Sequence, residues 1–343
     1  MIFLPKIKSW MLLVTSATTL ISCQSGANIG TSDVGRNLKP GLQLSSEDYG
    51  EREDGSGAFR THCLESHQSN DDPLVYPDQP NATHSHVFFG NPSVDAFTKA
   101  KSLRQATKTT CDGNTLNRSA YWVPALYGAD GRRIPYIEPL FYYKTGYHLP
   151  ASSIQTPPED LRMIAGQAMP NVLQSTQAVK FRCASWTSNQ SWFDDGDPLD
   201  HIAHIPDCKK GDLVEMRIVF PQCWDGKNLD SDDHQSHMAY PSEATPPMTG
   251  TGACPASHPI AIPEISYNFA IYVTDETGPS TAWRLSSDMN AKLPAGHSAH
   301  ADWMNGWDND IMRAIVENCL NPAFECSVGL LGDGTRLVSV IEE

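Results

Sequence analysis

The pattern of apolar and polar positions along the chain favours short β-strands separated by turns. Aromatic and β-branched residues gather in short runs, and 24 glycines and 25 prolines interrupt the sequence between them. Helical spacing is indicated in Val94–Arg104 and in a second segment that follows Asp308, a good N-cap residue, and runs to about Cys319. The predicted strands are Ser85–Phe89, Ala120–Leu126, Tyr136–Tyr143, Ala178–Cys183, Leu213–Val219 and Ile265–Val273.

These elements predict a mainly β fold, a single β-sandwich or jelly-roll-like domain with long loops and a few short helices. Residues 58–343 contain no second linker-like stretch, so we expect them to form one globular domain. Residues 23–57 are rich in Gly, Ser, Asp and Glu and are predicted to be a flexible tether.

The first residues resemble a targeting segment. Two lysines precede an apolar run that ends near Ile21 and is too short for a comfortable membrane span. The run closes with Leu20-Ile21-Ser22-Cys23, which resembles a bacterial lipobox. We therefore expect residues 1–22 to be a lipoprotein signal peptide and Cys23 to carry lipid. Gln24 after it favours the outer membrane, with the protein periplasmic or surface-facing. A plain secretory signal with a chance cysteine is the alternative.

Composition limits the partners of the chain. The formal net charge is −15. Nucleic-acid binders need basic patches, so this charge argues against nucleic acid as a partner. It also argues against docking on anionic head groups, so we expect membrane contact only through the lipid anchor.

Eight cysteines remain besides Cys23, and an even number in an exported protein indicates disulfides. Eight cysteines allow about 105 pairings, so the sequence leaves the connectivity open. A zinc site is the rival interpretation, but the chain has no Cys-x-x-Cys pair. We favour pairs of neighbours, which gives about four disulfides: Cys63–Cys111, Cys183–Cys208, Cys223–Cys254 and Cys319–Cys326.

Six of the twelve histidines lie in three tight pairs, at 84 and 86, at 234 and 237, and at 297 and 300. Alternate residues of a strand share a face, so His84 and His86 would point the same way. That geometry suits two ligands of one metal ion, or a base and its orienting partner. His300 and Asp302 repeat the spacing with a carboxylate. A polar strand face under a loop is the alternative for His84 and His86.

The segment 220–241 concentrates carboxylates, imidazoles and aromatic rings in one loop. Its Asp225, Asp233, His234 and His237 could tune acid–base chemistry or bind a cation. Trp224 could stack on a sugar. The alternative is an acidic, solvated loop closed by a disulfide.

Other motifs are weaker or absent. Trp303 and Trp307 follow the third histidine pair at helical spacing, which is more typical of core than of a ligand platform. His201 and His204 lie in a predicted surface turn and are left out of the candidate site. The chain lacks a nucleophile elbow, a P-loop, a dinucleotide fingerprint and a zincin motif. Common serine hydrolases, nucleotide enzymes and metalloproteases are therefore disfavoured.

Several segments together resemble the domain-of-unknown-function family numbered 1996, found in secreted bacterial and fungal proteins. The family has no established activity, so the resemblance transfers no catalytic residue. Fungal relatives often carry carbohydrate-binding modules, which by analogy points to polysaccharide. The matching segments span nearly all of residues 58–335; they are Phe59–His67, Asp71–Pro73, Thr83–Asn91, Ser119–Leu126, Phe220–Pro241, Cys254–Pro263 and Gly296–Asp308.

The first functional hypothesis is an extracytoplasmic enzyme that cleaves glycosidic bonds by hydrolysis or β-elimination. An imidazole would act as general base or acid with a carboxylate partner. The catalytic candidates are His84, His86, His234, His237, Asp225 and Asp233. The candidates for substrate binding are Arg60, Trp224, Lys227 and Tyr240. If a cofactor is present, it is one divalent metal ion, with ligands from His84, His86, His237, His300 and Asp302.

Two other hypotheses stay open. A non-catalytic surface lipoprotein would use the same side chains to bind glycan or capture a metal ion. Alternatively, the histidines are hydrogen-bonding struts that order long loops, since buried polar groups must find partners. Converging imidazoles in a cleft would favour chemistry or metal binding over struts.

Overall fold

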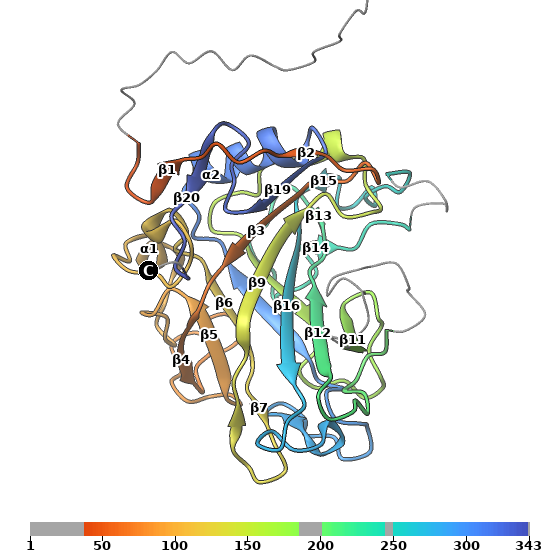
Figure 1. The fold of residues 1–343 in the computed structure, drawn as a ribbon. Coiled ribbons are helices and arrows are strands. Elements are labelled where there is room, and N and C mark those ends of the chain that lie inside the picture. Colours follow the sequence, from red (N-terminus) through yellow and green to blue (C-terminus); the bar gives the residue numbers. More distant parts are fainter. Residues whose placement is uncertain (1–37, 185–200, 244–249, 342–343) are drawn as a thin grey trace, which may run out of the picture. The chain divides into compact units, whose positions relative to one another are not determined.

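The computed structural model describes residues 38–184, 201–243 and 250–341, and these residues are mainly β (Figure 1). A five-stranded sheet has the order β10-β18-β6-β5-β4, and a seven-stranded sheet has the order β11-β12-β16-β9-β3-β19-β2. The five-stranded sheet consists of β4 (Glu65–Ser69), β5 (His86–Gly90), β6 (Ala120–Pro124), β10 (Arg162–Gly166) and β18 (His300–Met304). The seven-stranded sheet consists of β2 (Gly50–Glu51), β3 (Ala58–His62), β9 (Ile137–Lys144), β11 (Val179–Ala184), β12 (Leu213–Val219), β16 (Glu264–Tyr272) and β19 (Phe324–Val328).

Short elements complete the fold. The remaining strands pair in small sheets: β1 (Leu42–Leu44) with β20 (Thr335–Leu337); β13 (Cys223–Trp224) with β14 (Met238–Ala239) and β15 (Ile260–Ala261); β7 (Leu126–Tyr127) with β8 (Arg133–Ile134) and β17 (Arg284–Leu285). The helices are α1 (Ala100–Arg104), α2 (Asn309–Ala314), the π-helix η5 (Ile315–Leu320), and the 3-10 turns η1 (Asn114–Leu116), η2 (Ala151–Ser153) and η4 (Ser280–Ala282).

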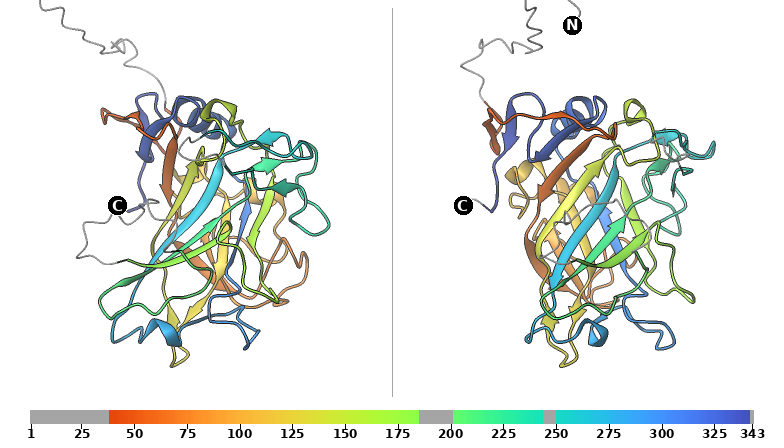
Figure 2. Two further views of the ribbon diagram at one scale, coloured as in Figure 1. Left: turned by 90° about the vertical axis from the view of Figure 1, so that its right-hand side faces the viewer. Right: turned by 45° about the vertical axis from the view of Figure 1, so that its right-hand side comes forward.

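The six predicted strand segments all contain observed strands. They correspond to β5, β6 with β7, β9, β11, β12 and β16, and β12 has the predicted bounds. Neighbouring strands are antiparallel except β3 and β19, which are parallel. Figures 1 and 2 show β9, β16 and β12 side by side in the seven-stranded sheet.

The two large sheets face each other across an aromatic core. Phe89 and Tyr121 project from the five-stranded sheet, and their ring centroids lie 5.7 and 4.3 Å from that of Phe141 in the opposite sheet. The hydroxyl of Tyr267 donates a hydrogen bond of 2.7 Å to the carbonyl of Asp302 on the other sheet. Trp303 and Trp307 are both buried in this core. The structure therefore confirms the predicted β-sandwich with long loops and the core interpretation of the two tryptophans.

All four predicted disulfides are present. The pairs are Cys63–Cys111, Cys183–Cys208, Cys223–Cys254 and Cys319–Cys326. Each disulfide joins two cysteines that are consecutive in the sequence.

A second apolar cluster covers the outer face of the five-stranded sheet. Phe88 of β5 and Trp122 of β6 stack with ring centroids 5.4 Å apart, and the residues preceding and forming α1 pack on them through Leu74, Val94 and Leu103. The segments that connect β4 to β5 and β5 to β6 thus shield part of this face from water. His86, Asp302 and Trp122 lie on the same outer face, because alternate residues of a strand share a side.

The structure differs from the prediction in two places, the start of the folded unit and the length of the first helix. The folded unit begins at Leu38 rather than at residue 58, since β1 pairs with β20. Gly41 lies so near Gly113 that a Cβ would come within 2.1 Å of its carbonyl oxygen, a close approach that composition does not reveal. The first helix is only α1, because Val94–Lys99 forms turns. Asp308 is confirmed as the N-cap of α2, which continues into η5.

No helix within the described ranges is both long enough and apolar enough to cross a membrane.

Candidate functional site

Three histidines from distant parts of the chain meet on the outer face of the five-stranded sheet. His86 begins β5, His84 lies two residues before it, and His300 begins β18. β6 separates β5 from β18, with β5 pairing to one edge and β18 to the other. The sheet therefore brings both histidines of the first predicted pair, His84 and His86, into contact with His300 of the third pair.

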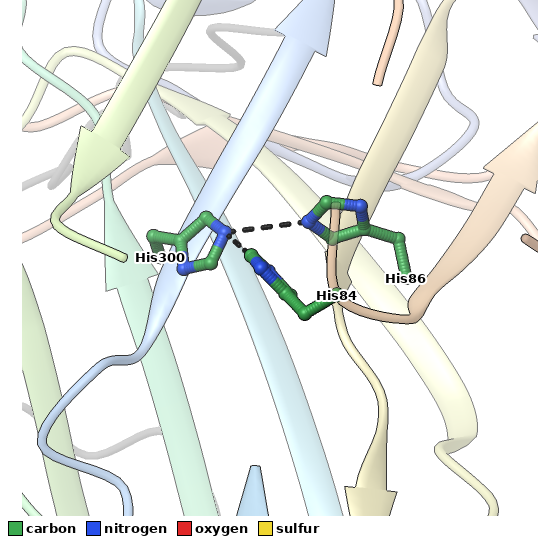
Figure 3. A group of neighbouring side chains, drawn as sticks. All are labelled: His84, His86 and His300. Carbon is green, nitrogen blue, oxygen red and sulfur yellow. Dashed lines mark hydrogen bonds between the residues drawn. The ribbon is translucent and has the colours of Figure 1, made fainter. Parts of the chain in front are cut away.

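The facing atoms of the three rings are Nε2 nitrogens. Nε2 of His300 lies 3.3 Å from Nε2 of His84 and 3.4 Å from Nε2 of His86. Figure 3 shows both rings pointing toward His300. His86 and His300 are almost fully buried, and His84 is half-buried. The three ligand atoms could hold one metal ion.

The opposite nitrogens of two rings are fixed by main-chain carbonyls. Nδ1 of His300 lies 2.8 Å from the carbonyl oxygen of Ser298, and Nδ1 of His86 lies 3.3 Å from that of Asp71. A carbonyl only accepts, so each Nδ1 must carry the proton and donate. In the neutral rings, both Nε2 atoms are then acceptors that face each other without a proton between them. A cation between them would satisfy both, and main-chain carbonyls commonly orient metal-binding histidines in this way.

Burial keeps the imidazoles neutral. Loss of hydration lowers the pKa of His84 to about 4. It lowers the pKa of His300 to about 3, with a further contribution from His84, and that of His86 well below its usual value. Neutral imidazole is the form that binds metal ions.

Two buried carboxylates adjoin the histidines. Ligand atoms of Asp72, His86 and Asp302 all lie within 4.8 Å of one another, and this group could also hold a cation. Both carboxylate oxygens of Asp302 are buried and have no hydrogen-bond partner among the described residues. Burial, and then the charge of Asp72, raise the pKa of Asp302 well above its usual value. Asp72 is held by the backbone N–H groups of Leu74 and Val75, each at 2.9 Å.

The cluster lies in the wall of a cavity of about 660 Å³, which we call the histidine cavity. His84, His300, Asp72 and Asp302 line it, together with Asp233 of the acidic loop. The site is thus accessible to a ligand, although His86 itself is buried beneath the lining.

The acidic loop contributes less than the sequence predicts. Asp233 accepts hydrogen bonds from the backbone N–H and side chain of Ser236, from Gln235 and from Ser231, which hold its pKa well below the usual range. His234 bonds Asp230 at 2.9 Å and does not line the histidine cavity.

His237 lies apart from the three-histidine cluster. Its Nδ1 bonds the hydroxyl of Ser231 at 2.9 Å and its Nε2 bonds the carbonyl of Arg162 at 2.7 Å. With both nitrogens engaged and the ring buried, His237 ties the acidic loop to β10. His297, the partner of His300 in sequence, instead contacts Asp288 at 3.1 Å.

The predicted substrate-binding side chains are also separate from the cluster. The indole of Trp224 donates to the carbonyl of Asn228, and Asp225 accepts from the backbone N–H groups of Lys227 and Asn228. Arg60 pairs with Glu325 on the seven-stranded sheet. None of these residues, and neither Lys227 nor Tyr240, lines the histidine cavity.

Substitution of His237 separates a structural histidine from a ligand. We expect His237→Ala to lower the free energy of unfolding by about 1–3 kcal/mol, because it removes the two hydrogen bonds that join the buried ring to Ser231 and to the carbonyl of Arg162. The metal content should stay that of the wild type. Chemical denaturation and elemental analysis of the same preparation measure both. Loss of metal with unchanged stability would instead make His237 a ligand.

The sequence did not single out Asp72 as a site residue. It stands in the Asp71-Asp72-Pro73 segment, far from either histidine pair, and only the packing of this segment on the sheet brings it to His86. Asp72 follows another aspartate and precedes a proline, and this acidic pair is the sequence feature that could have marked it as a site residue.

Fold and site together define a disulfide-linked β-sandwich with a buried histidine–carboxylate cluster whose side chains could hold a metal ion. The chain belongs to the family described as Domain of unknown function (DUF1996), whose sequence model matches residues 72–307. That range contains His84, His86, His300, Asp72 and Asp302. No curated protein and no solved structure matches the chain.

Proposed function

We propose that this protein is a metal-dependent enzyme that cleaves glycosidic bonds of a polysaccharide outside the cytoplasm. The observation that carries the proposal is the convergence of three Nε2 atoms, two of them with Nδ1 fixed on carbonyls, at the wall of an open cavity. Three histidines with room for a further ligand are typical of catalytic zinc sites.

The residues divide into ligands and neighbours. His84, His86 and His300 hold the ion, and Asp302 and Asp72 offset its charge. A bound divalent ion would supply Lewis acidity and lower the pKa of a bound water. Imidazole donors suit zinc, copper, iron and nickel better than magnesium or calcium. Asp233, ionised and fixed at the cavity wall, is placed to hold a polar group of the substrate.

Two features support an extracytoplasmic glycan as target. Four disulfides are typical of proteins from oxidising compartments. The lipobox-like Cys23 would anchor the protein at the cell envelope, where polysaccharide is abundant. Capture of a metal ion without turnover is the alternative, and the near-complete burial of His86 and Asp302 favours it.

Chelation followed by readdition of metal tests the proposal. Untagged protein is incubated with a broad polysaccharide panel, and reducing ends and unsaturated products are measured separately. We expect products that disappear after chelation and return with one equivalent of zinc or another transition metal. Reducing ends without unsaturation indicate hydrolysis, and unsaturated ends indicate β-elimination. Metal binding without products across the panel would replace catalysis by metal capture.

A further inference from the structure

The histidine cavity adjoins two further hollows that lead away from the cluster. A second cavity of about 370 Å³ shares Ile164, Gly166, Gln167 and Gln235 with it. A third cavity of about 400 Å³ shares Ser175, Gln177 and Tyr240 with the second. The three cavities are therefore neighbours, and we call them together the groove.

The groove has exposed apolar side chains along its first two cavities. Met169 and Met289 in the histidine cavity are 77% and 78% exposed, and Val172 and Leu173 in the second cavity are 72% and 44% exposed. Exposed apolar side chains gathered in a groove mark a binding surface. Gln174 donates to the carbonyls of His297 and Ala299 and so fixes this wall to the segment leading into β18.

The far cavity of the groove is cationic, although the chain as a whole is acidic. Lys180 of β11, Arg217 of β12 and Lys144 of β9 line it from the seven-stranded sheet, with Glu243 and Glu264 as the acidic lining residues. Glu264 pairs with Lys144 at 3.2 Å, and Arg217 pairs with Glu215 at 2.7 Å. Lys180 neither donates a hydrogen bond nor forms an ion pair within the described residues. Burial lowers the pKa of Lys180; the charges of Arg217 and Lys144 add to this effect, and those of Glu264 and Glu215 oppose it.

An amide oxygen complements the lysine. Gln222 is 1% exposed, and its Nε2 donates to the carbonyl of Thr145 at 2.6 Å. Gln222 lines the far cavity, and its buried Oε1 has no hydrogen-bond partner among the described residues. A buried acceptor without a partner is costly, so this oxygen is placed to accept from a ligand hydroxyl.

We propose that the far cavity binds the carboxylate of a uronic acid residue in a polysaccharide that extends along the groove to the histidine cluster. Lys180 pairs with the carboxylate and Gln222 accepts from a hydroxyl of the same sugar. The assignment of a cleavable substrate rests on the proposed function, whereas binding in the far cavity is measurable without turnover.

Metal-free protein tests this directly. The probes are alginate, polygalacturonate and a glucuronate polymer, each compared with its carboxyl-reduced form by calorimetry. We expect at least one acidic polymer to bind more tightly than its reduced form, and Lys180→Met to weaken that binding at least about tenfold. Lys180→Arg should retain it, and Lys101→Met, in exposed α1, is the matched control.

The outcomes separate the two proposals. Equal binding of acidic and reduced chains, or wild-type affinity in Lys180→Met, overturns the cationic subsite. If Lys180→Met does not fold, the salt dependence of binding by the wild-type protein is measured in its place. Loss of acidic-polymer binding at high salt would support the subsite, and binding that does not change with salt would count against it. Charge-dependent binding without metal-dependent cleavage would retain the subsite and reject the enzyme.

Discussion

The His86→Ala variant is expected to purify without bound metal and to lose turnover by at least about 100-fold. Partners that only orient a metal ligand already change affinity or activity by about 10–100-fold, and removal of a ligand should cost no less. His86 is the stringent choice, because it belongs both to the three-histidine group and to the group with Asp72 and Asp302. Elemental analysis and product formation are measured on the same preparation.

His204→Ala is the matched control for this variant. The ring of His204 contacts only the carbonyl of Ile205 among the described residues and lines none of the three cavities. It should keep metal content and turnover. If His86→Ala retained a full equivalent of metal and wild-type activity, the cluster would not be the metal centre.

Trp303→Ala should destabilise the protein by about 3–5 kcal/mol, the usual cost of truncating a buried aromatic side chain. Trp303 is fully buried between the two sheets, with its ring centroid 6.5 Å from that of Tyr143. It also follows Asp302 on β18, so the cavity left behind would loosen the strand that carries His300. Urea denaturation measures the loss.

Trp224→Ala provides the comparison, because it removes the same side chain from a partly buried position in β13. Trp224 is only partly buried and mainly donates to Asn228. We expect a loss of about 1 kcal/mol. Equal losses in the two variants would contradict the assignment of Trp303 to the core and of Trp224 to a loop contact.

Local pattern was sufficient to predict most of the sandwich. Strands such as Leu213–Val219 are runs of β-branched and apolar residues between turns, and their burial on assembly reinforces that preference. The disulfides also follow the order of the sequence, since each joins two consecutive cysteines. The pairing of β1 with β20 was not predictable, since it depends on contacts between the two ends of the domain.

The site was predictable only where strand geometry dictated it. His84, His86, His300 and Asp302 were identified because alternate residues share a face, and that face proved common to β5 and β18. His237 has equally suggestive spacing, yet loop packing turns both its nitrogens toward Ser231 and Arg162. Asp72 and Lys180 lie on segments whose neighbours are set by tertiary packing, which no local pattern encodes.

An anomalous difference map from crystals of untagged wild-type protein tests the central claim most directly. The protein is saturated with zinc and data are collected on both sides of the zinc absorption edge. We predict one strong peak between the Nε2 atoms of His84, His86 and His300. A map without a peak there, or with zinc only at other residues, would contradict the assignment of this cluster as a metal centre.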